Sequence, residues 1–570
     1  MKNISRLALS SAIAAQLFAL TATAATYYWD DNAAGLDFGT AGASTGTWTG
    51  TTAGPTAGWS LSGTGVDAFA PFTTDLADVL NFGNGAVGLG AGTIAVSGTV
   101  NAGNMTFASG SGAILLSGGT IHLASAETIT VDNAGNTINS ILSGAATSLT
   151  KAGTGTLTLS GNNDYTGPTV ISNGILTISH NNALGSTAGN TTIAATGSNN
   201  GPRLTLGGGI TSAENISISG TTETGNYSSV ITNTSGTNTL GGNITLASPS
   251  GGIRIGSGAG ELIFSGTISQ TGTNRALVLQ ASTGAALTVN NAIGNNNGPL
   301  TVINPGAVTL KGASTAIGAT TIAEGGFLRI GVTNAIKTDQ NLTIGSPWNF
   351  TGSDQGTFDL AGFNQTVNAL IGTKNTTVGT IGSDSTRIVT NSATGTSTLT
   401  VGNGNGTGTF NGVINDGGAG KIVALTKTGT GTLTLVGDSN YSGVTTISAG
   451  TVSISHANAL GSTTGNTTIA TNGNVMRLNL IGNITTAENI TIAGATEASG
   501  FNPVISGAGT LSGTITLSGL TNGIRMGGVT FSGTIQQIGS SQFLALAGTT
   551  VNNAINNNGG DLQINVGTST

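Results

Sequence analysis

The stretch Leu149–Leu159, which reads LTKAGTGTLTL, decides the fold of this chain. Its last four residues alternate threonine with leucine, which is the period-two pattern of a β-strand with one buried face. The same alternation occurs in Asn243–Leu246 and Thr514–Leu517. No segment sustains helical spacing, and Gly, Asn, Asp or Ser residues follow the strand-like runs. The sequence therefore predicts an all-β fold of short strands joined by tight turns.

This stretch belongs to a long internal duplication. It returns 276 positions later as Leu425–Leu435 (LTKTGTGTLTL), and the match continues through a Tyr-x-Gly, an Ile-Ser-His and an Ala-Glu-Asn-Ile motif. A block of about 160 residues, 149–308, is thus repeated as 425–570. A weaker copy of its opening lies between the two, at 308–330.

Repeats of short strands predict a solenoid. Strands of four to six residues cannot bury a face alone, whereas stacked coils let each apolar stripe cover the next. Glycine supplies 95 of the 570 residues, and it reaches the corner conformations of such coils without a Cβ clash. We expect Leu157 and Leu159, with their equivalents Leu433 and Leu435, to point inward and contact leucine or isoleucine on the coils above and below. Thr158 is expected to face water.

The composition excludes several classes of protein. Only 6% of the residues are charged, the formal net charge is -7, and there is no cysteine. With 15 basic residues and no basic cluster, the chain offers little to bind phosphates, so no nucleic-acid partner is expected. Disulfide scaffolds are excluded, and low charge with 37% hydrophobic residues argues against disorder.

The N-terminus is typical of an export signal. Lys2 and Arg6 precede an apolar stretch from Leu7 to Leu20, and Ala22-Thr23-Ala24 resembles a signal-peptidase site. We predict a signal peptide at residues 1–24 and a mature chain that begins at Ala25 or Thr26. No later segment has the roughly 18 consecutive apolar residues of a spanning helix, so no transmembrane helix is expected in the mature chain.

The strings Gly153–Ile171 and Gly429–Ile447 resemble the autotransporter-associated β-strand repeat, and Gly356–Val367 with Thr398–Gly402 resembles the stretch that leads into it. The resemblance covers roughly residues 150–570. It implies an exported bacterial surface or extracellular protein built on a right-handed parallel β-helix, as in type V secretion passengers, with no shared catalytic residues. The sequence up to residue 570 lacks the longer alternating segments of an outer-membrane barrel. We expect either that it is a fragment or that the protein is secreted or anchored by other means.

These features predict the domain layout. Residues 25–110 form an N-terminal cap and the first strands, because three of the four tryptophans (Trp29, Trp48 and Trp59) and many acidic residues fall here and a solenoid end needs covering. Residues 111–308 form β-helix with the first long copy at 149–308, residues 309–424 carry the degenerate repeat, and 425–570 form the second copy, which is expected to be incomplete. A tryptophan platform for carbohydrate is the alternative interpretation of the cap.

Candidate sites are few. Gly83–Gly88 fits G-x-G-x-x-G and Gly42–Gly46 fits the nucleophile-elbow pattern, but both are expected by chance at this glycine content and no helix pattern follows. His122 is interpreted as an outward strand residue, and His180 and His456 as equivalent structural features of the two copies. Asp30-Asp31-Asn32 is interpreted as an exposed start of the mature chain. The sequence predicts no catalytic, cofactor-binding or metal-binding residues, and no cofactor.

The most highly charged stretch runs from Lys337 to Arg387. Asp339, Asp354, Asp359, Lys374 and Asp384 lie between them. We interpret these charges as solvation of loops. The alternative is acid–base chemistry on neighbouring coils, as in a β-helical polysaccharide lyase or hydrolase.

The function hypothesis is therefore structural rather than enzymatic. The chain is expected to be an exported rod for adhesion, aggregation or matrix contact, located outside the cell or at the outer membrane of a Gram-negative-type bacterium. Its expected partners are cell-surface or matrix glycans, or other copies of itself. A carbohydrate-active enzyme is the alternative.

Overall fold

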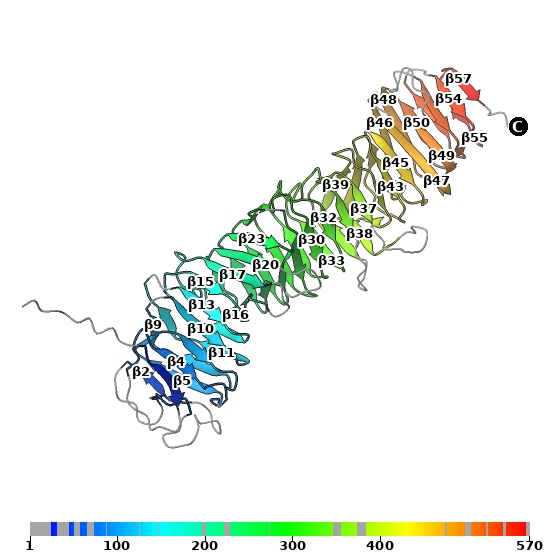
Figure 1. The fold of residues 1–570 in the computed structure, drawn as a ribbon. Helices are drawn as coiled ribbons and strands as arrows, with labels where there is room; N and C mark the ends of the chain where they lie inside the picture. The colour runs from blue at the N-terminus through cyan, green and yellow to red at the C-terminus, as the bar shows by residue number, and fades with distance from the viewer. Residues whose placement is uncertain are drawn as a thin grey trace, which may run out of the picture.

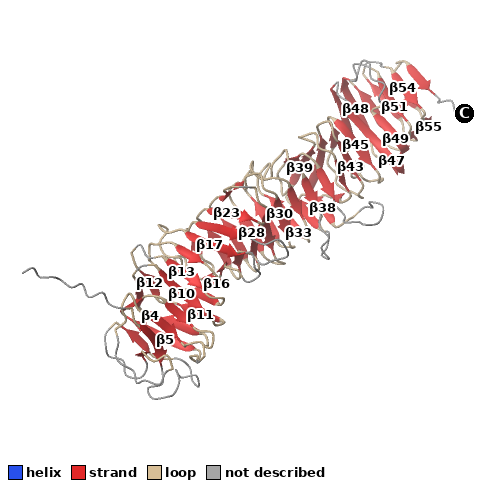
Figure 2. Cartoon of the chain, in the orientation of Figure 1, coloured by secondary structure: helices blue, strands red, loops and turns tan. Residues whose placement is uncertain are grey.

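The computed structural model describes most of the chain. The described residues are 24–30, 45–50, 58–64, 73–86, 88–124, 126–145, 148–196, 201–221, 229–272, 274–345, 355–372, 384–472, 476–495, 503–519, 523–539 and 543–565. Within them every regular element is a β-strand, 57 strands in all, and none is a helix (Figure 2). The all-β prediction is confirmed. The predicted signal peptide lies outside the described residues except for Ala24 and stays a prediction.

The strands stack into one long rod (Figure 1). The chain advances steadily from one end to the other, so that each coil contacts mainly the coil before it and the coil after it. Successive coils are joined by hydrogen bonds such as that between Thr177 and Thr205, 28 positions apart, and that between Asn139 and Ser160, 21 positions apart. This is the quasi-one-dimensional arrangement of a solenoid.

Six sheets form the faces of the rod. The 12-stranded sheet contains β29 (Ile293–Gly294), β26 (Ile268–Gln270), β23 (Ile244–Ser250), β20 (Ile216–Thr221), β17 (Thr191–Thr196), β15 (Thr169–Ile171), β13 (Leu149–Ala152), β10 (Glu127–Val131), β7 (Met105–Phe107), β4 (Val79–Phe82), β1 (Thr26–Asp30) and β3 (Gly58–Ser60). The 14-stranded sheet contains β2 (Thr47–Thr49), β5 (Gly92–Ser97), β8 (Ile114–Ser117), β11 (Gly135–Ile138), β14 (Thr156–Leu159), β16 (Ile175–Ile178), β18 (Arg203–Leu206), β21 (Ile231–Asn233), β24 (Ile253–Ser257), β27 (Leu277–Ala281), β30 (Leu300–Ile303), β32 (Thr320–Ile322), β34 (Leu342–Ile344) and β37 (Leu370–Gly372).

A third face begins with a three-stranded sheet and continues with a nine-stranded one. These contain β12 (Ile141–Ser143), β9 (Thr120–Leu123) and β6 (Thr99–Ala102), and then β19 (Thr211–Ser212), β22 (Thr237–Leu240), β25 (Glu261–Phe264), β28 (Ala286–Val289), β31 (Ala307–Leu310), β33 (Gly326–Ile330), β35 (Gly356–Asp359), β38 (Arg387–Thr390) and β41 (Val413–Ile414).

Two further sheets carry the C-terminal part of the rod. The nine-stranded sheet contains β36 (Gln365–Val367), β39 (Gly395–Val401), β42 (Lys421–Lys427), β44 (Thr445–Ile447), β46 (Thr467–Asn472), β48 (Ile490–Ala495), β50 (Ile515–Ser518), β53 (Ile535–Ile538) and β56 (Ile555–Asn556). The ten-stranded sheet contains β40 (Gly408–Phe410), β43 (Thr432–Leu435), β45 (Gly450–Ile454), β47 (Met476–Thr486), β49 (Ile505–Leu511), β51 (Ile524–Gly527), β54 (Leu544–Ala547) and β57 (Leu562–Asn565), with β52 (Thr530–Phe531) and β55 (Thr550–Val551) paired at its side. Apart from β1 with β3, the pairings are parallel, which confirms the predicted parallel β-solenoid.

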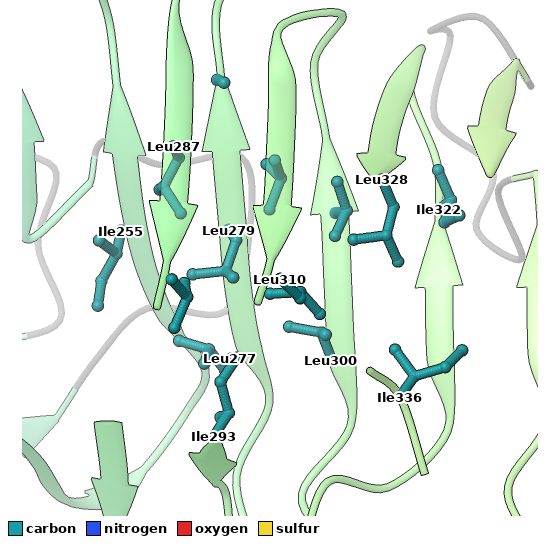
Figure 3. Packing of buried hydrophobic residues seen from close by; sticks show 14 of the residues in the cluster. Ile255, Leu277, Leu279, Leu287, Ile293, Leu300, Leu310, Ile322, Leu328 and Ile336 are labelled. Carbon is teal, nitrogen blue, oxygen red and sulfur yellow. The ribbon is translucent and has the colours of Figure 1, made fainter. Parts of the chain in front are cut away.

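The core is a set of aliphatic columns that run along the rod. Ile255 pairs with Leu279, Leu279 with Val302, and Val302 with Ile322, each on the next coil (Figure 3). All four side chains are fully buried. Because the register keeps inward positions in line, one apolar stripe covers the next, and burial of each leucine or isoleucine stabilises two neighbouring coils.

The predicted inside and outside positions are confirmed. Leu157, Leu159, Leu433 and Leu435 are at most 2% exposed, whereas Thr158 is partly exposed. The predicted neighbours are correct above Leu157, which pairs with Leu176, but wrong below it, where Asn136 occupies the column. The prediction is correct on both sides of Leu159, which lies between Ile138 and Ile178, and wrong on both sides of Leu433, which lies between Gly408 and Val452. Inward positions thus also accept asparagine, whose amide is hydrogen-bonded there, and glycine, as well as aliphatic residues.

Glycine is needed at the corner of the repeat. Gly153 and Gly429 adopt left-handed φ values of 75° and 63°. A Cβ at Gly155 would lie 1.9 Å from the carbonyl oxygen of Asn133 on the preceding coil. The Gly-x-Gly of the repeat therefore combines a conformational requirement with a steric one.

The N-terminal end of the rod is closed by aromatic packing. Trp59 makes edge-to-face contacts with Trp29 and Trp48, with ring centroids 5.1 and 5.3 Å away. The three rings are 0–3% exposed, so they form core and cannot be a carbohydrate platform. The 12-stranded sheet ends here in β3, which pairs antiparallel with β1. A cap at 25–110 with these bounds stays a prediction.

The interpretation of Asp30 as part of an exposed start is wrong. Asp30 is 1% exposed at the end of β1, where it is a paired strand residue opposite Gly58 of β3 and not part of a free chain end. Asp31 and Asn32 lie outside the described residues.

Candidate functional sites

A buried polar ladder crosses three coils of the first long copy. The Tyr165 hydroxyl contacts Thr169 Oγ1 at 2.7 Å, and Thr169 stacks in register on Thr191. Thr191 Oγ1 donates to Glu214 Oε1 at 3.3 Å. All four residues are at most 3% exposed. The ladder places an ionisable carboxyl in the wall of the rod.

The second copy repeats this ladder residue by residue. Tyr441 contacts Thr445 at 2.6 Å, Thr445 stacks on Thr467, and Thr467 donates to Glu488 at 2.9 Å. Burial raises the pKa of Glu214 and of Glu488 to about 7, with the threonine hydrogen bond opposing the shift. Burial also raises the pKa of both tyrosines. Desolvation disfavours the charged form of an acid, so the two carboxyls titrate near neutral pH.

Each copy also holds a lysine in a cradle of backbone carbonyls. Lys151 Nζ donates to the carbonyl oxygens of Ala152, Gly153 and Asn173 at 2.7, 3.0 and 3.2 Å. Lys427 makes the equivalent contacts with Thr428, Gly429 and Ala449. Burial lowers the pKa of each lysine to about 8. Three carbonyl acceptors match the three donors of an ammonium group, so each lysine ties the repeat's corner to the next coil.

Sequence reasoning missed these ladders and cradles. One available signal was that Lys151 and Glu214 recur as Lys427 and Glu488 in a chain with only 6% charged residues. Both classes of site are closed to solvent. Their lysine ammonium groups and their tyrosine and threonine hydroxyls bond within the protein, whereas Glu214 Oε2 is buried without a hydrogen-bond partner among the described residues. Both classes of site are therefore structural devices of the repeat.

The interpretation of the 337–387 charges as loop solvation is wrong for two residues. Asp359 is fully buried in β35 and accepts from Arg329 Nε at 2.8 Å. Arg387 is fully buried at the start of β38 and donates to Asp384 at 2.6 Å. Strand register brings Arg329 and Asp359 together from neighbouring coils, whereas Asp384 lies three residues before Arg387. Asp339 is half exposed, as expected. Asp354 and Lys374 lie outside the described residues.

We predict that Asp359→Asn destabilises the middle of the rod by about 1–3 kcal/mol, because it weakens a charge-assisted bond to Arg329 while keeping the shape. The carboxylate also accepts the backbone N–H groups of Ala361 and Ser392. Thermal unfolding should show a lower melting temperature than in Asp339→Asn, an exposed control. Equal melting temperatures in the two variants would contradict a stabilising role for the pair.

The remaining candidates are structural. His122 lies outward and contacts Ser143 at 3.1 Å. His180 and His456 accept the backbone N–H of Asn182 and Asn458 through Nδ1, at 3.1 and 3.3 Å, as equivalent turn residues. After Gly83–Gly88 the chain enters strand β5 and not a helix. Residues 42–44 of the nucleophile-elbow pattern lie outside the described residues. Where the structure describes the chain, no group of three or more His, Cys, Asp or Glu residues is placed to hold a metal.

The fold and the two long copies together define a duplicated parallel β-solenoid in which each copy contains a buried polar ladder. Three segments match the passenger-associated-transport-repeat family model, at residues 149–178, 300–330 and 425–454. The predicted resemblance is confirmed, and the chain contains three such repeats, one in each long copy and one in the degenerate region.

One curated relative is similar over part of the chain. The adhesin BmaC autotransporter of Brucella suis biovar 1 (strain 1330) is 34% identical over 170 residues. This alignment covers 30% of the present chain and 4% of the relative, so the chain spans a small part of the relative's length. No solved structure matches significantly. Among the described residues, no helix has the length and hydrophobicity to cross a membrane.

Proposed function

We propose that this chain is the extended, exported passenger part of a bacterial surface protein and that it acts as an adhesive rod. The observation that carries the proposal is the uniform parallel solenoid built on passenger-associated-transport repeats. The partial similarity to an autotransporter adhesin supports it. A rigid rod holds its side faces away from the cell, where they reach another surface.

The proposed role is not enzymatic. The carboxylates that would serve a polysaccharide-cleaving β-helix are engaged in ion pairs, Asp359 with Arg329 and Asp384 with Arg387. These partners hold the charges of both carboxylates in structural contacts. The predicted signal peptide and the repeats support a location outside a Gram-negative-type bacterium. The partners we propose are glycans of a cell surface or matrix, or further copies of the chain.

Bead adhesion tests this function. Fluorescent beads coated with the full mature chain should attach to cultured epithelial cells or to cell-free matrix several-fold more than albumin-coated beads. Periodate treatment of the target surface cleaves vicinal diols and should abolish attachment if glycans are the partner. Attachment equal to albumin on both surfaces would contradict adhesion, and clumping of beads without cells would favour self-association.

A further inference from the structure

A cleft opens on one corner of the rod, between two successive corner loops in its middle. Its volume is about 280 Å³. One wall is the loop after β31, with Ala313 and Thr315, and the other is the loop after β33, with Asn334, Lys337 and Asp339. Lys337 and Asp339 begin the charged stretch 337–387, and the adhesive function proposed above assigns no role to them.

The walls of the cleft are fixed by hydrogen bonds between coils. The backbone N–H of Ser314 donates to the carbonyl oxygen of Ala335 at 3.1 Å, which joins the two loops. The backbone N–H of Asn334 donates to Asn364 at 2.9 Å, and its side-chain oxygen accepts the N–H of Thr366 at 3.0 Å. A pocket held from both sides is preformed, so a ligand would not have to order it.

The charges at the rim cancel. Lys337 Nζ lies 3.4 Å from Asp339 Oδ1 and 3.0 Å from Asn297 Oδ1. The side chain of Lys337 is 23% exposed and that of Asp339 is 52% exposed. A balanced pair offers no net attraction to a phosphate or to a metal ion, and it favours a ligand that is polar and neutral.

The rim keeps hydrogen-bonding capacity for such a ligand. Lys337 uses one of its three N–H donors on Asn297 and forms an ion pair with Asp339. Within the described part of the chain, Asp339 Oδ2, the Asn334 NH₂ group and the Thr315 hydroxyl make no hydrogen bond to the protein. Ala313 is exposed and supplies apolar surface beside these groups, and the buried Ile336 closes the cleft beneath them. Few convergent polar groups around an apolar floor are typical of small-molecule sites.

We propose that this cleft binds one ring of a neutral saccharide. A sugar ring carries neighbouring hydroxyls, each both donor and acceptor, which match an alternation of Lys, Asp, Asn and Thr groups, while its C–H face packs on Ala313. The volume of about 280 Å³ lies just below the roughly 300–1,000 Å³ of drug-sized ligand pockets, which suits a single ring.

This inference deepens the proposed adhesive function, on which it rests, by naming a site and a ligand class. Saturation-transfer-difference NMR on the full mature chain tests it directly. The probes are the methyl glycosides of glucose, galactose, mannose and N-acetylglucosamine. We expect a transfer signal with at least one probe, reduced at least five-fold by Asp339→Asn and by Thr315→Trp, which fills the cleft. Asp438→Asn, an exposed carboxylate on another coil, is the matched control and should retain the signal.

Failure of the site is distinguishable from failure of the function. No signal with any probe, or an undiminished signal in both cleft variants, would overturn the saccharide site, and equal melting temperatures exclude misfolding as the cause of a loss. If beads coated with the wild type and with the cleft variants adhere equally, the saccharide site is contradicted and the proposed adhesive function still stands. Glycoside binding lost in the variants, with no bead adhesion by the wild type, would support the site and contradict the adhesive role.

Discussion

A Leu157→Asp variant is expected to be cut by proteinase K near residue 157 while residues 425–570 stay resistant. Leu157 is fully buried between Leu176 above and Asn136 below. Asn136 can offer the new carboxylate at most one N–H, because the other is bonded to Asn133 and its oxygen accepts from Ile114 and Asn133. An unpaired charge there costs several kcal/mol even after relaxation.

The damage should stay local because solenoid stability is roughly a sum of coil and nearest-neighbour terms. Thr158→Asp is the matched control, one residue away on the partly exposed outer face, and we expect wild-type resistance from it. Time-resolved proteolysis with mass spectrometry of the fragments distinguishes the two. Cleavage throughout the chain at equal rates in Leu157→Asp would show one cooperative unit and contradict the additive solenoid.

The repeats made most of the fold predictable from sequence. Alternation in Leu149–Leu159 and its copy predicts strands and inward leucines, and the duplication predicts stacking, because both signals are local or directly repeated. Glycine at the Gly-x-Gly corner follows from the same geometry. Alternation does not predict which residue lies above or below a given leucine on the neighbouring coils. Coil length varies, and the register of each strand pair depends on the corner that precedes it. Asn136 below Leu157 is the result.

The buried charged groups were less predictable for a related reason. Lys151, Glu214 and Asp359 each bond to a group on an adjacent coil, and the sequence alone does not place these partners together. A charged residue read in isolation is most often solvated. Only recurrence distinguishes Lys151 and Glu214 from Asp359, which has no equivalent copy. The cleft at Asn334–Asp339 is also formed between coils, so its walls became visible only in the folded chain.

Raising the pH from 5 to 7.5 is expected to destabilise both long copies through Glu214 and Glu488. The pKa of each carboxyl is about 7 in the fold and 4.5 as an ordinary value, and desolvation is the largest cause. A raised folded pKa means that the stabilising contribution is fully present below about 4.5 and is lost as pH rises through about 7. Over that window we expect a loss of roughly 2–3 kcal/mol per carboxyl. The folded pKa values of Lys151 and Lys427 are about 8, so these lysines change the pH dependence of stability mainly above this window.

The Glu214→Gln/Glu488→Gln double variant removes the titration and keeps the side-chain shape. Its amide retains an oxygen for the hydroxyls of Thr191 and Thr467, so folding at pH 5 should be close to wild type. Thermal melts followed by circular dichroism between pH 5 and 7.5 should show a falling melting temperature for the wild type and for Glu324→Gln, a partly exposed control. The double variant should give a nearly flat profile. A double variant that loses stability with pH as steeply as the wild type would place the titrating groups elsewhere, and the buried ladders would then be neutral contacts without a role in pH dependence.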